Sequence, residues 1–306
     1  MTQKKYTDVT RLGHKSTAGV LTVGDYIVIQ EKIDGANASF TITDGELKAF
    51  SRNIELSEDN RLGGFYDFVF EQEEEEFADS LNTDYIYFGE WTNQHKITYE
   101  GNMKKFFLFD IYSKSQEKYL DFSVTNAEAN RLGLNLVPVF YVGKYESFEQ
   151  LQEYIGKTML NGKLGDVETG EGIVVKNVDY VDRFGNQMYV KLVTDAFREV
   201  QKQKQAKNPT EYMSTPEYLL AESVATYPRV EKIIYKLRDE SIIGEEIEPK
   251  QFGLIFKECN LRTWEDVLKE ESDSIAPEMD IEKLRKYTSS LATKHAKTYL
   301  MEVGAM

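Results

Sequence analysis

Short apolar runs separated by polar turns fill the first 200 residues, and this pattern predicts a domain built mainly of β-strands. The runs are rich in β-branched and aromatic residues and are bounded by Gly, Asp or Asn, as strands are. They cover residues 26–29, 39–42, 85–88, 106–109, 136–140, 173–175 and 188–190. Thr43-Asp44-Gly45, after the second run, predicts a hairpin turn, because Asp-Gly tolerates the left-handed backbone that such turns need. We therefore expect mostly antiparallel sheet.

Two predicted helices interrupt these strands. One covers residues 125–132 and ends at Gly133. The other covers residues 147–155, with Ser147 as its N-cap and Gly156 as its end. The first part of the chain therefore combines sheet with inserted helices.

The pattern changes near residue 197, where apolar residues begin to recur at spacings of three and four. This helical spacing covers residues 230–237, 249–257, 263–269 and 281–299. The segment Asn208-Pro209-Thr210 predicts a joint before them. The sequence predicts an α+β chain, with a catalytic domain of antiparallel sheets and helices at 1–205 and a small all-α domain at 206–306.

Composition narrows the classes of function. The chain has 37 Lys+Arg against 52 Asp+Glu and a net charge of -15, so a protein that coats nucleic acid with its whole surface is not expected. Residues 1–200 hold 21 of these bases and 33 of these acids. A single cysteine, Cys259, excludes an intramolecular disulfide and favours a reducing, cytoplasmic compartment. We expect neither a signal peptide nor a membrane span.

The segment Glu31-Lys32-Ile33-Asp34-Gly35-Ala36-Asn37 directly follows a predicted strand. A lysine that leaves a buried strand beside an acid and a glycine can become a nucleophile, because desolvation lowers an amine pKa. Gly35 would let the backbone turn closely beside a phosphate. Alone, this segment fits a plain hairpin with a solvent-exposed lysine better than it fits a nucleophile.

Further segments place charged or stacking residues at strand ends, where a site on a rigid sheet would have them. They are Ser51-Arg52-Asn53, Phe88-Gly89-Glu90-Trp91, Phe107-Leu108-Phe109-Asp110, Glu171-Gly172-Ile173-Val174-Val175-Lys176 and Val190-Lys191-Leu192. In this order, across residues 31–193, the set resembles the motifs of the covalent nucleotidyltransferases, which include ATP-dependent DNA ligases, RNA ligases and mRNA capping enzymes. The helical tail is similar to that of the RNA ligase 2 family and unlike the β-rich domain of the other two classes. The resemblance extends over nearly the full chain.

This resemblance implies an ATP-grasp-like ligase fold and three catalytic residues. Lys32 would attack the α-phosphorus of ATP and hold AMP as a phosphoramidate. Glu171 would be the acid needed for metal-assisted transfer and the ligand of Mg²⁺ or Mn²⁺. Lys191 would lie on the triphosphate or AMP phosphate, where an ammonium group offsets developing charge.

The resemblance also implies a set of residues that bind the nucleotide. Glu31 would lie near adenine and Asn37 near the reacting phosphate. Arg52 would contact the nucleotide and order the RNA end. Glu90 would hold the ribose and Phe109 would stack on adenine. Lys176 would join Lys191 on the phosphates.

The implied function is an ATP-dependent RNA ligase that seals 3′-OH and 5′-phosphate ends, with nicked duplex RNA as the expected partner and no obligate protein partner. The alternatives are an ATP-dependent DNA ligase, an mRNA guanylyltransferase, or a nucleic-acid-binding repair scaffold that has lost ligation. Two positions depart from the family pattern. Asp34 stands where several members carry histidine, and Val193 stands where many carry a second lysine.

RNA would need a locally basic surface on this acidic chain. The candidates are Arg198, Lys202, Lys204, Lys207, Arg229, Lys232, Lys236 and Arg238. Helical spacing places Arg229, Lys232 and Lys236 on one face. A solvated helix paired with its own acids, Glu231 among them, explains this face equally well, so these residues remain candidates.

Overall fold

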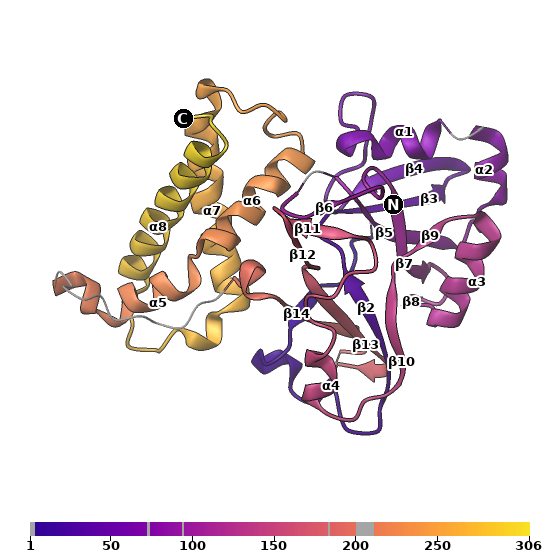
Figure 1. Cartoon of the computed structure of the whole chain (residues 1–306), viewed down its shortest axis with the longest axis horizontal. Coiled ribbons are helices and arrows are strands. Elements are labelled where there is room, and N and C mark those ends of the chain that lie inside the picture. The colour runs from indigo at the N-terminus through magenta and orange to yellow at the C-terminus, as the bar shows by residue number, and fades with distance from the viewer. Residues whose placement is uncertain (1–3, 72–73, 94, 183, 200–210) are drawn as a thin grey trace. The chain divides into compact units, whose positions relative to one another are not determined.

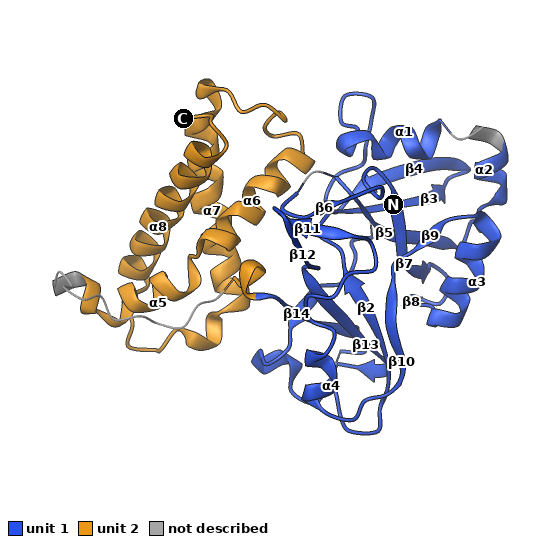
Figure 2. Ribbon diagram, in the orientation of Figure 1, with its two compact units in different colours: residues 1–194 blue, residues 195–306 orange. Residues whose placement is uncertain are grey.

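The computed structural model describes residues 4–71, 74–93, 95–182, 184–199 and 211–306. The chain divides into two compact units, residues 1–194 and 195–306 (Figure 2). The predicted domain boundary between residues 205 and 206 lies outside the described residues and stays a prediction. Each unit is considered by itself below.

Two antiparallel sheets form most of unit 1 (Figure 1). The first sheet has the order β1 (Val9–Arg11), β14 (Gln187–Val193), β13 (Gly172–Val181), β2 (Tyr26–Lys32) and β10 (Val139–Lys144), with β1 parallel to β14. The second has the order β4 (Glu46–Ser51), β3 (Ala36–Thr43), β5 (Tyr85–Trp91), β7 (Phe106–Ser113) and β8 (Lys118–Tyr119). The short β9 (Asn135–Leu136) runs parallel to β7. A third, smaller sheet joins β12 (Val167–Glu168), β11 (Gly162–Leu164) and β6 (Thr98–Tyr99).

Each large sheet has one face covered by helices. The second sheet packs Phe40 and Leu108 against α1 (Phe65–Phe70), α2 (Glu74–Ser80) and α3 (Phe122–Leu132). On the first sheet, Ile29 packs against Leu151 of α4 (Phe148–Gln152). Because side chains alternate along a strand, the opposite faces of both sheets are left for other contacts. A further apolar cluster joins those faces, with Tyr189 from the first sheet and Phe88 from the second.

The α+β prediction for unit 1 is confirmed, and most strands lie where the apolar runs indicated. Asp44 and Gly45 both have positive φ, 53° and 82°, in the β3–β4 turn, as the Asp-Gly signal predicted. The single strand predicted at 136–140 is wrong, because the segment divides between β9 and β10 in different sheets. Pro138 lies at the division and has no N–H to donate, so neither ladder can continue through it.

The helices predicted in unit 1 are confirmed in place but differ in length. Helix α3 begins three residues earlier than expected and ends at Gly133, which has a φ of 66°. Helix α4 begins after Ser147, whose side chain accepts from Gln150 N, but it ends at Gln152, before Gly156. The apolar pattern therefore located both helices and fixed one end of each.

Unit 2 is helical, as predicted. Its helices are α5 (Pro216–Val224), α6 (Tyr227–Asp239), α7 (Phe252–Glu270) and α8 (Ile281–Glu302). The predicted helices at 249–257 and 263–269 form one element, the 3-10 turn η5 (Pro249–Gln251) followed by α7. Helix α5 was not predicted, although Thr215 caps it and Pro216 stands at its first turn, a recognised start signal.

Helix α8 packs along both α7 and α5, and its apolar side joins the two cores of the unit. None of the helices in the described part of the chain is long and apolar enough to cross a membrane.

Candidate active site

Lys32 and Glu171 form the centre of the candidate site. Lys32 is the last residue of β2, and the residue opposite it in β13 is Gly172. Glu171 directly precedes that glycine, and its Oε2 lies 2.6 Å from Lys32 Nζ. The two side chains are 22% and 10% exposed, so the pair is largely shielded but still reachable from solvent. The structure therefore brings the predicted nucleophile and the predicted metal ligand together.

Gly172 makes this arrangement possible. A Cβ at this position would lie 2.1 Å from the Leu192 carbonyl oxygen and 2.7 Å from Val193 Cα. Only a residue without a side chain allows β13 to enter between β2 and β14 so closely. The carbonyl of Glu171 accepts from Thr194 N at 2.9 Å, which fixes the residue at the strand entrance.

A row of residues crosses the first sheet on the same face as Lys32. Gln30 lies opposite Val174, and Val174 lies opposite Lys191. Alternation along β2 places Gln30, two residues before Lys32, on this face. Lys191 is buried, as is Gln30, which is 1% exposed. Two ammonium groups and one amide therefore lie on the face that looks toward the second sheet.

Glu90 brings the second sheet into the site. It lies in β5 opposite Asn37 of β3, so these two predicted residues are neighbours. The pKa of Glu90 is raised to about 8, mainly by burial. The nearby Lys32 lowers this pKa and the Glu171 carboxylate raises it. Such effects need proximity, so the Lys32–Glu171 pair and Glu90 share one electrostatic environment.

Asp34 anchors the turn that follows Lys32. Its Oδ2 accepts from the backbone N–H groups of Lys96 and Ile97, each at 2.8 Å, and its own N–H donates to the Tyr99 hydroxyl at 2.7 Å. His95 Nδ1 lies 3.6 Å from Oδ1. Burial alone would raise the pKa of Asp34, but the contacts with His95 and the Ile97 N–H hold it below its ordinary value. The turn is thus fixed to the 95–99 segment.

Phe109 and Lys176 lie deeper between the two sheets. The Lys176 Nζ donates to Asp110 Oδ2 at 2.7 Å and to the Phe109 carbonyl oxygen at 2.8 Å. The Tyr6 hydroxyl donates to the same carboxylate oxygen, and the Tyr6 ring lies 4.7 Å from the Phe109 ring. Burial lowers the pKa of Lys176 and raises that of Asp110, while their attraction opposes both shifts. Lys176 therefore has protein partners that fix the middle of β7, where Phe109 lies. The strand end predicted at Phe109-Asp110 is wrong, because β7 continues to Ser113.

Two predicted site residues have partners away from this centre. Glu31 lies on the other face of β2 from Lys32, and its carboxylate accepts from Thr158 Oγ1 at 2.7 Å and from Met159 N at 2.8 Å. Arg52 follows β4 and donates to Asp8 Oδ1 at 2.6 Å. Their roles toward adenine and RNA stay predictions.

Three residues that lie at the site in the structure were not predicted from the sequence. Gln30 could have been found as a polar residue two positions before Lys32 in an apolar strand, because that spacing gives the same face. His95 has no local signal, because its partner Asp34 is 61 residues away in the sequence. Tyr6 carried no local signal, since its partner Asp110 lies 104 residues further on.

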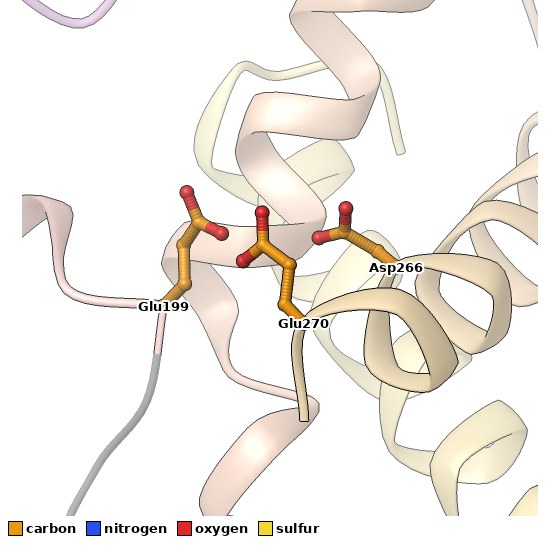
Figure 3. Close-up of side chains that lie close together, drawn as sticks. All are labelled: Glu199, Asp266 and Glu270. Atoms are coloured by element: carbon orange, nitrogen blue, oxygen red, sulfur yellow. The ribbon is translucent and has the colours of Figure 1, made fainter. Parts of the chain in front are cut away.

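Unit 2 contains a cluster of three acidic side chains, separate from the Lys32–Glu171 pair (Figure 3). Within the described part of the chain, Glu199, Asp266 and Glu270 are the group whose oxygens lie close enough together to hold a metal ion. Basic side chains already neutralise it, because Arg229 lies 3.0 Å from Asp266 Oδ2 and Lys232 is paired with Glu199. We interpret it as an ion-pair network.

That network also changes the set of candidate RNA-binding residues. Arg229 is fully buried in it, so it is not part of a solvent-exposed face. Lys202, Lys204 and Lys207 lie outside the described residues. Arg198 is exposed and pairs with Asp195 at 2.8 Å.

Fold and site together define an α+β protein with a lysine–glutamate pair at the junction of two antiparallel sheets. Residues 25–193 match the family model for RNA ligase, and this segment contains every predicted site residue. The chain belongs to the RNA ligase family. No curated protein matches it significantly.

Solved structures of variant forms of Naegleria gruberi RNA ligase are similar to part of the chain. One with ATP and Mn has 18% identity and a TM-score of 0.45, covering 62% of this chain and 57% of that chain. A second with ATP and Mn has 19% identity and a TM-score of 0.49, covering 63% and 57%. A third, with AMP and Mn, has 18% identity and a TM-score of 0.46, covering 62% and 57%. The chain thus spans less than two thirds of each of these proteins.

Proposed function

We propose that this chain is an ATP-dependent RNA ligase that joins a 3′-OH end to a 5′-phosphate end through a covalent lysyl-AMP intermediate. The observation that carries the proposal is the Lys32–Glu171 pair, 2.6 Å apart within the segment that matches the family. A lysine amine beside an acid, mostly shielded from water, is suited to act as a nucleophile on phosphorus.

The first step is the attack of the Lys32 amine on the α-phosphorus of ATP. A P–N bond forms, the bond to the pyrophosphate oxygen breaks, and the amine must lose a proton. Glu171 Oε2 accepts a hydrogen bond from Nζ, so it orients the amine and lies in place to receive that proton. Lys191 on the same sheet face would offset charge on the phosphates.

The nucleoside would lie between the two sheets. Phe109, held by Tyr6 and Lys176, offers a ring for adenine. Glu90, with a pKa of about 8, would be largely protonated at neutral pH, so its carboxyl group could donate as well as accept at a ribose hydroxyl. Asn37 lies opposite Glu90 and would face the sugar and α-phosphate.

A divalent metal fits the donor chemistry at Glu171. Mg²⁺ takes hard oxygen ligands and is usually held by one or two carboxylates together with substrate phosphates. Glu171 supplies one such carboxylate beside the nucleophile, and Mn²⁺ accepts the same ligands. When bound, the metal would neutralise phosphate charge. The acidic cluster of unit 2 is already neutralised by basic side chains and is not proposed for this role.

In the second step AMP passes from Lys32 to the 5′-phosphate of an RNA end. In the third, a 3′-hydroxyl attacks that activated phosphate, a phosphodiester forms, and AMP leaves. Both are in-line displacements at phosphorus, so positioning and charge neutralisation supply most of the catalysis. We propose a nick in duplex RNA as the substrate, and the cytoplasm, where ATP and RNA ends meet, as the setting.

The test begins with intact mass spectrometry after incubation with ATP or GTP and Mg²⁺. We expect an AMP adduct with ATP, none with GTP, and none for Lys32→Ala. A GMP adduct would support a capping enzyme instead. Absence of any adduct, with Lys32→Ala behaving identically, would support a repair scaffold without ligase activity.

Sealing of nicked duplexes separates the remaining alternatives. The duplexes should differ only in the sugar of the 3′-hydroxyl strand. Faster sealing with ribose supports the RNA ligase proposal, and equal rates with deoxyribose support a DNA ligase.

A further inference from the structure

Helix α8 has one buried and one exposed face, and the two faces differ in charge as well as polarity. Its buried face is formed by Leu284, Thr288, Leu291, Ala292, Ala296, Tyr299 and Leu300. The helix has five basic residues and only two acids, Glu282 and Glu302, in a chain whose net charge is -15. The excess of positive charge on α8 is therefore opposite in sign to that of the chain.

Four of these basic residues lie on one solvent-exposed face. Lys283, Lys286, Lys294 and Lys297 are all exposed, and we call them the lysine stripe. Their spacings of 3, 8 and 3 residues keep them within one narrow arc at 3.6 residues per turn, on the side of α8 opposite its buried face. At a rise of about 1.5 Å per residue the stripe is about 21 Å long.

Acids do little to neutralise the lysine stripe. Lys283 is 3.4 Å from Asp280, which caps the helix, and both side chains are exposed, so this pair is weak. In the described part of the chain no carboxylate lies within ion-pair distance of Lys286, Lys294 or Lys297. Lys297 instead lies 5.8 Å from the centre of the Phe256 ring. Of the two acids on α8, Glu302 is engaged by the Tyr227 hydroxyl.

Three other basic residues of unit 2 have carboxylate partners. Arg229 is buried among Asp266 and Glu271, and Lys232 is paired with Glu199. Arg262 lies 2.7 Å from Glu240. Their charge is used within the unit. On α8, Arg285 is also exposed but lies on another side of the helix, so the lysine stripe is where several available positive charges lie in one row.

We propose that the lysine stripe is a binding surface for the phosphate backbone of the RNA substrate. A row of exposed ammonium groups without matching acids binds a regularly spaced polyanion and releases its counterions. It would hold RNA without reading its sequence. This inference rests on the proposed ligase function for its choice of partner, and it assigns that partner to a face the sequence analysis did not single out.

The test compares two triple variants of the full chain with the same change in net charge. The stripe variant is Lys286→Gln, Lys294→Gln and Lys297→Gln. The control variant is Lys144→Gln, Lys250→Gln and Arg285→Gln, at exposed positions off the stripe. Glutamine keeps helix propensity close to that of lysine, so both variants should fold. Circular dichroism checks this.

Affinity for a nicked RNA duplex is measured by fluorescence anisotropy across a range of KCl concentrations. We expect the stripe variant to bind more weakly and to lose about 2 to 3 units from the slope of log affinity against log salt concentration. The control variant should keep the native slope. AMP adduct formation with ATP alone should be unchanged in both, because that step needs no RNA.

The assignment would be overturned if the stripe variant kept the native RNA affinity, or if both variants lost RNA affinity equally. It would also be overturned if the stripe variant lost binding to phosphatidylserine vesicles while its RNA affinity stayed intact. The last result would assign the stripe to an anionic membrane surface. Failure of the native chain to form an AMP adduct would contradict the ligase proposal separately, whatever the anisotropy shows.

Discussion

Lys176 forms a buried ion pair with Asp110, 2.7 Å from Nζ to Oδ2, and the side chains are only 7% and 6% exposed. The same ammonium group donates to the carbonyl of Phe109, and the Tyr6 hydroxyl donates to the same carboxylate oxygen. Three segments that are distant in sequence therefore meet at one carboxylate. The position of the proposed adenine-stacking ring depends on this contact.

Removing one partner of this pair should destabilise the protein more than removing both. We expect Lys176→Met to cost about 3 to 5 kcal/mol of unfolding free energy, because it leaves Asp110 buried without its counter-charge. The double variant with Asp110→Leu should recover much of that loss. Urea unfolding measures both. If Lys176→Met keeps native stability and impairs only adenylylation, Lys176 acts on phosphate and the ion pair is secondary.

Much of this architecture could be predicted from local pattern. The strands that carry Lys32, Glu90, Phe109 and Lys191 contain the predicted apolar runs, although β7 and β14 continue past them. Motif order predicted where along the chain the candidate site lies. Local pattern does not show which side chains distant in the sequence become partners in the fold. Nothing near Tyr6 in the sequence indicates Asp110 as its partner, and nothing near Asp34 indicates His95.

The burial of charged side chains was the other feature that could not be predicted from the sequence pattern. Arg229 has helical spacing with Lys232 and Lys236, which predicts a basic surface face if charged residues are taken as exposed. In the structure Arg229 is fully buried, because two acids compensate its charge. Asp266 lies on α7 and Glu271 directly follows that helix. Such compensation depends on tertiary contacts between helices, so sequence spacing alone does not reveal it.

Glu171→Gln should keep the shape of the site and remove its charge. We expect formation of the lysyl-AMP adduct to slow by about 100-fold or more, since an electrostatic partner of the reacting group is lost. Single-turnover mass spectrometry with ATP and Mg²⁺ measures the rate. Glu168→Gln, an exposed acid on β12, is the matched control and should react at the native rate. Equal rates in the two variants would remove Glu171 from the catalytic set.

Glu90 should make stability depend on pH in a defined direction. Its pKa is raised to about 8 in the folded protein, so the unfolded chain releases this proton at lower pH than the folded one. The stabilisation of the folded protein by this bound proton is fully present below the unfolded pKa, near 4.5, and is lost as pH rises through about 8.

Glu90→Gln should therefore stabilise the protein at pH 8.5, by at most about 5 kcal/mol, with a smaller difference near pH 5. Thermal unfolding at both pH values measures this effect. A stability difference that is the same at both would show that Glu90 is ionised in the folded protein at neutral pH.

Gln30 offers a test that separates stability from function. Its Nε2 is buried and has no hydrogen-bond partner in the described structure, which costs about 1 to 3 kcal/mol. It lies on the same sheet face as Lys32, and we expect it to find its acceptor on the bound nucleotide. Gln30→Leu should therefore raise the unfolding free energy of the free protein, by about 1 kcal/mol, while weakening ATP binding about tenfold.

Gln187 is the matched contrast for that substitution. Its Oε1 accepts from Tyr119 N at 2.7 Å and its Nε2 donates to Tyr119 O at 3.3 Å, so both ends of this amide are satisfied within the protein. Gln187→Leu should lower stability and leave ATP affinity unchanged. Calorimetric titration with ATP and urea unfolding of both variants give the comparison. If Gln30→Leu destabilises the free protein as Gln187→Leu does, the Gln30 amide serves the fold, and the nucleotide must be held by other donors.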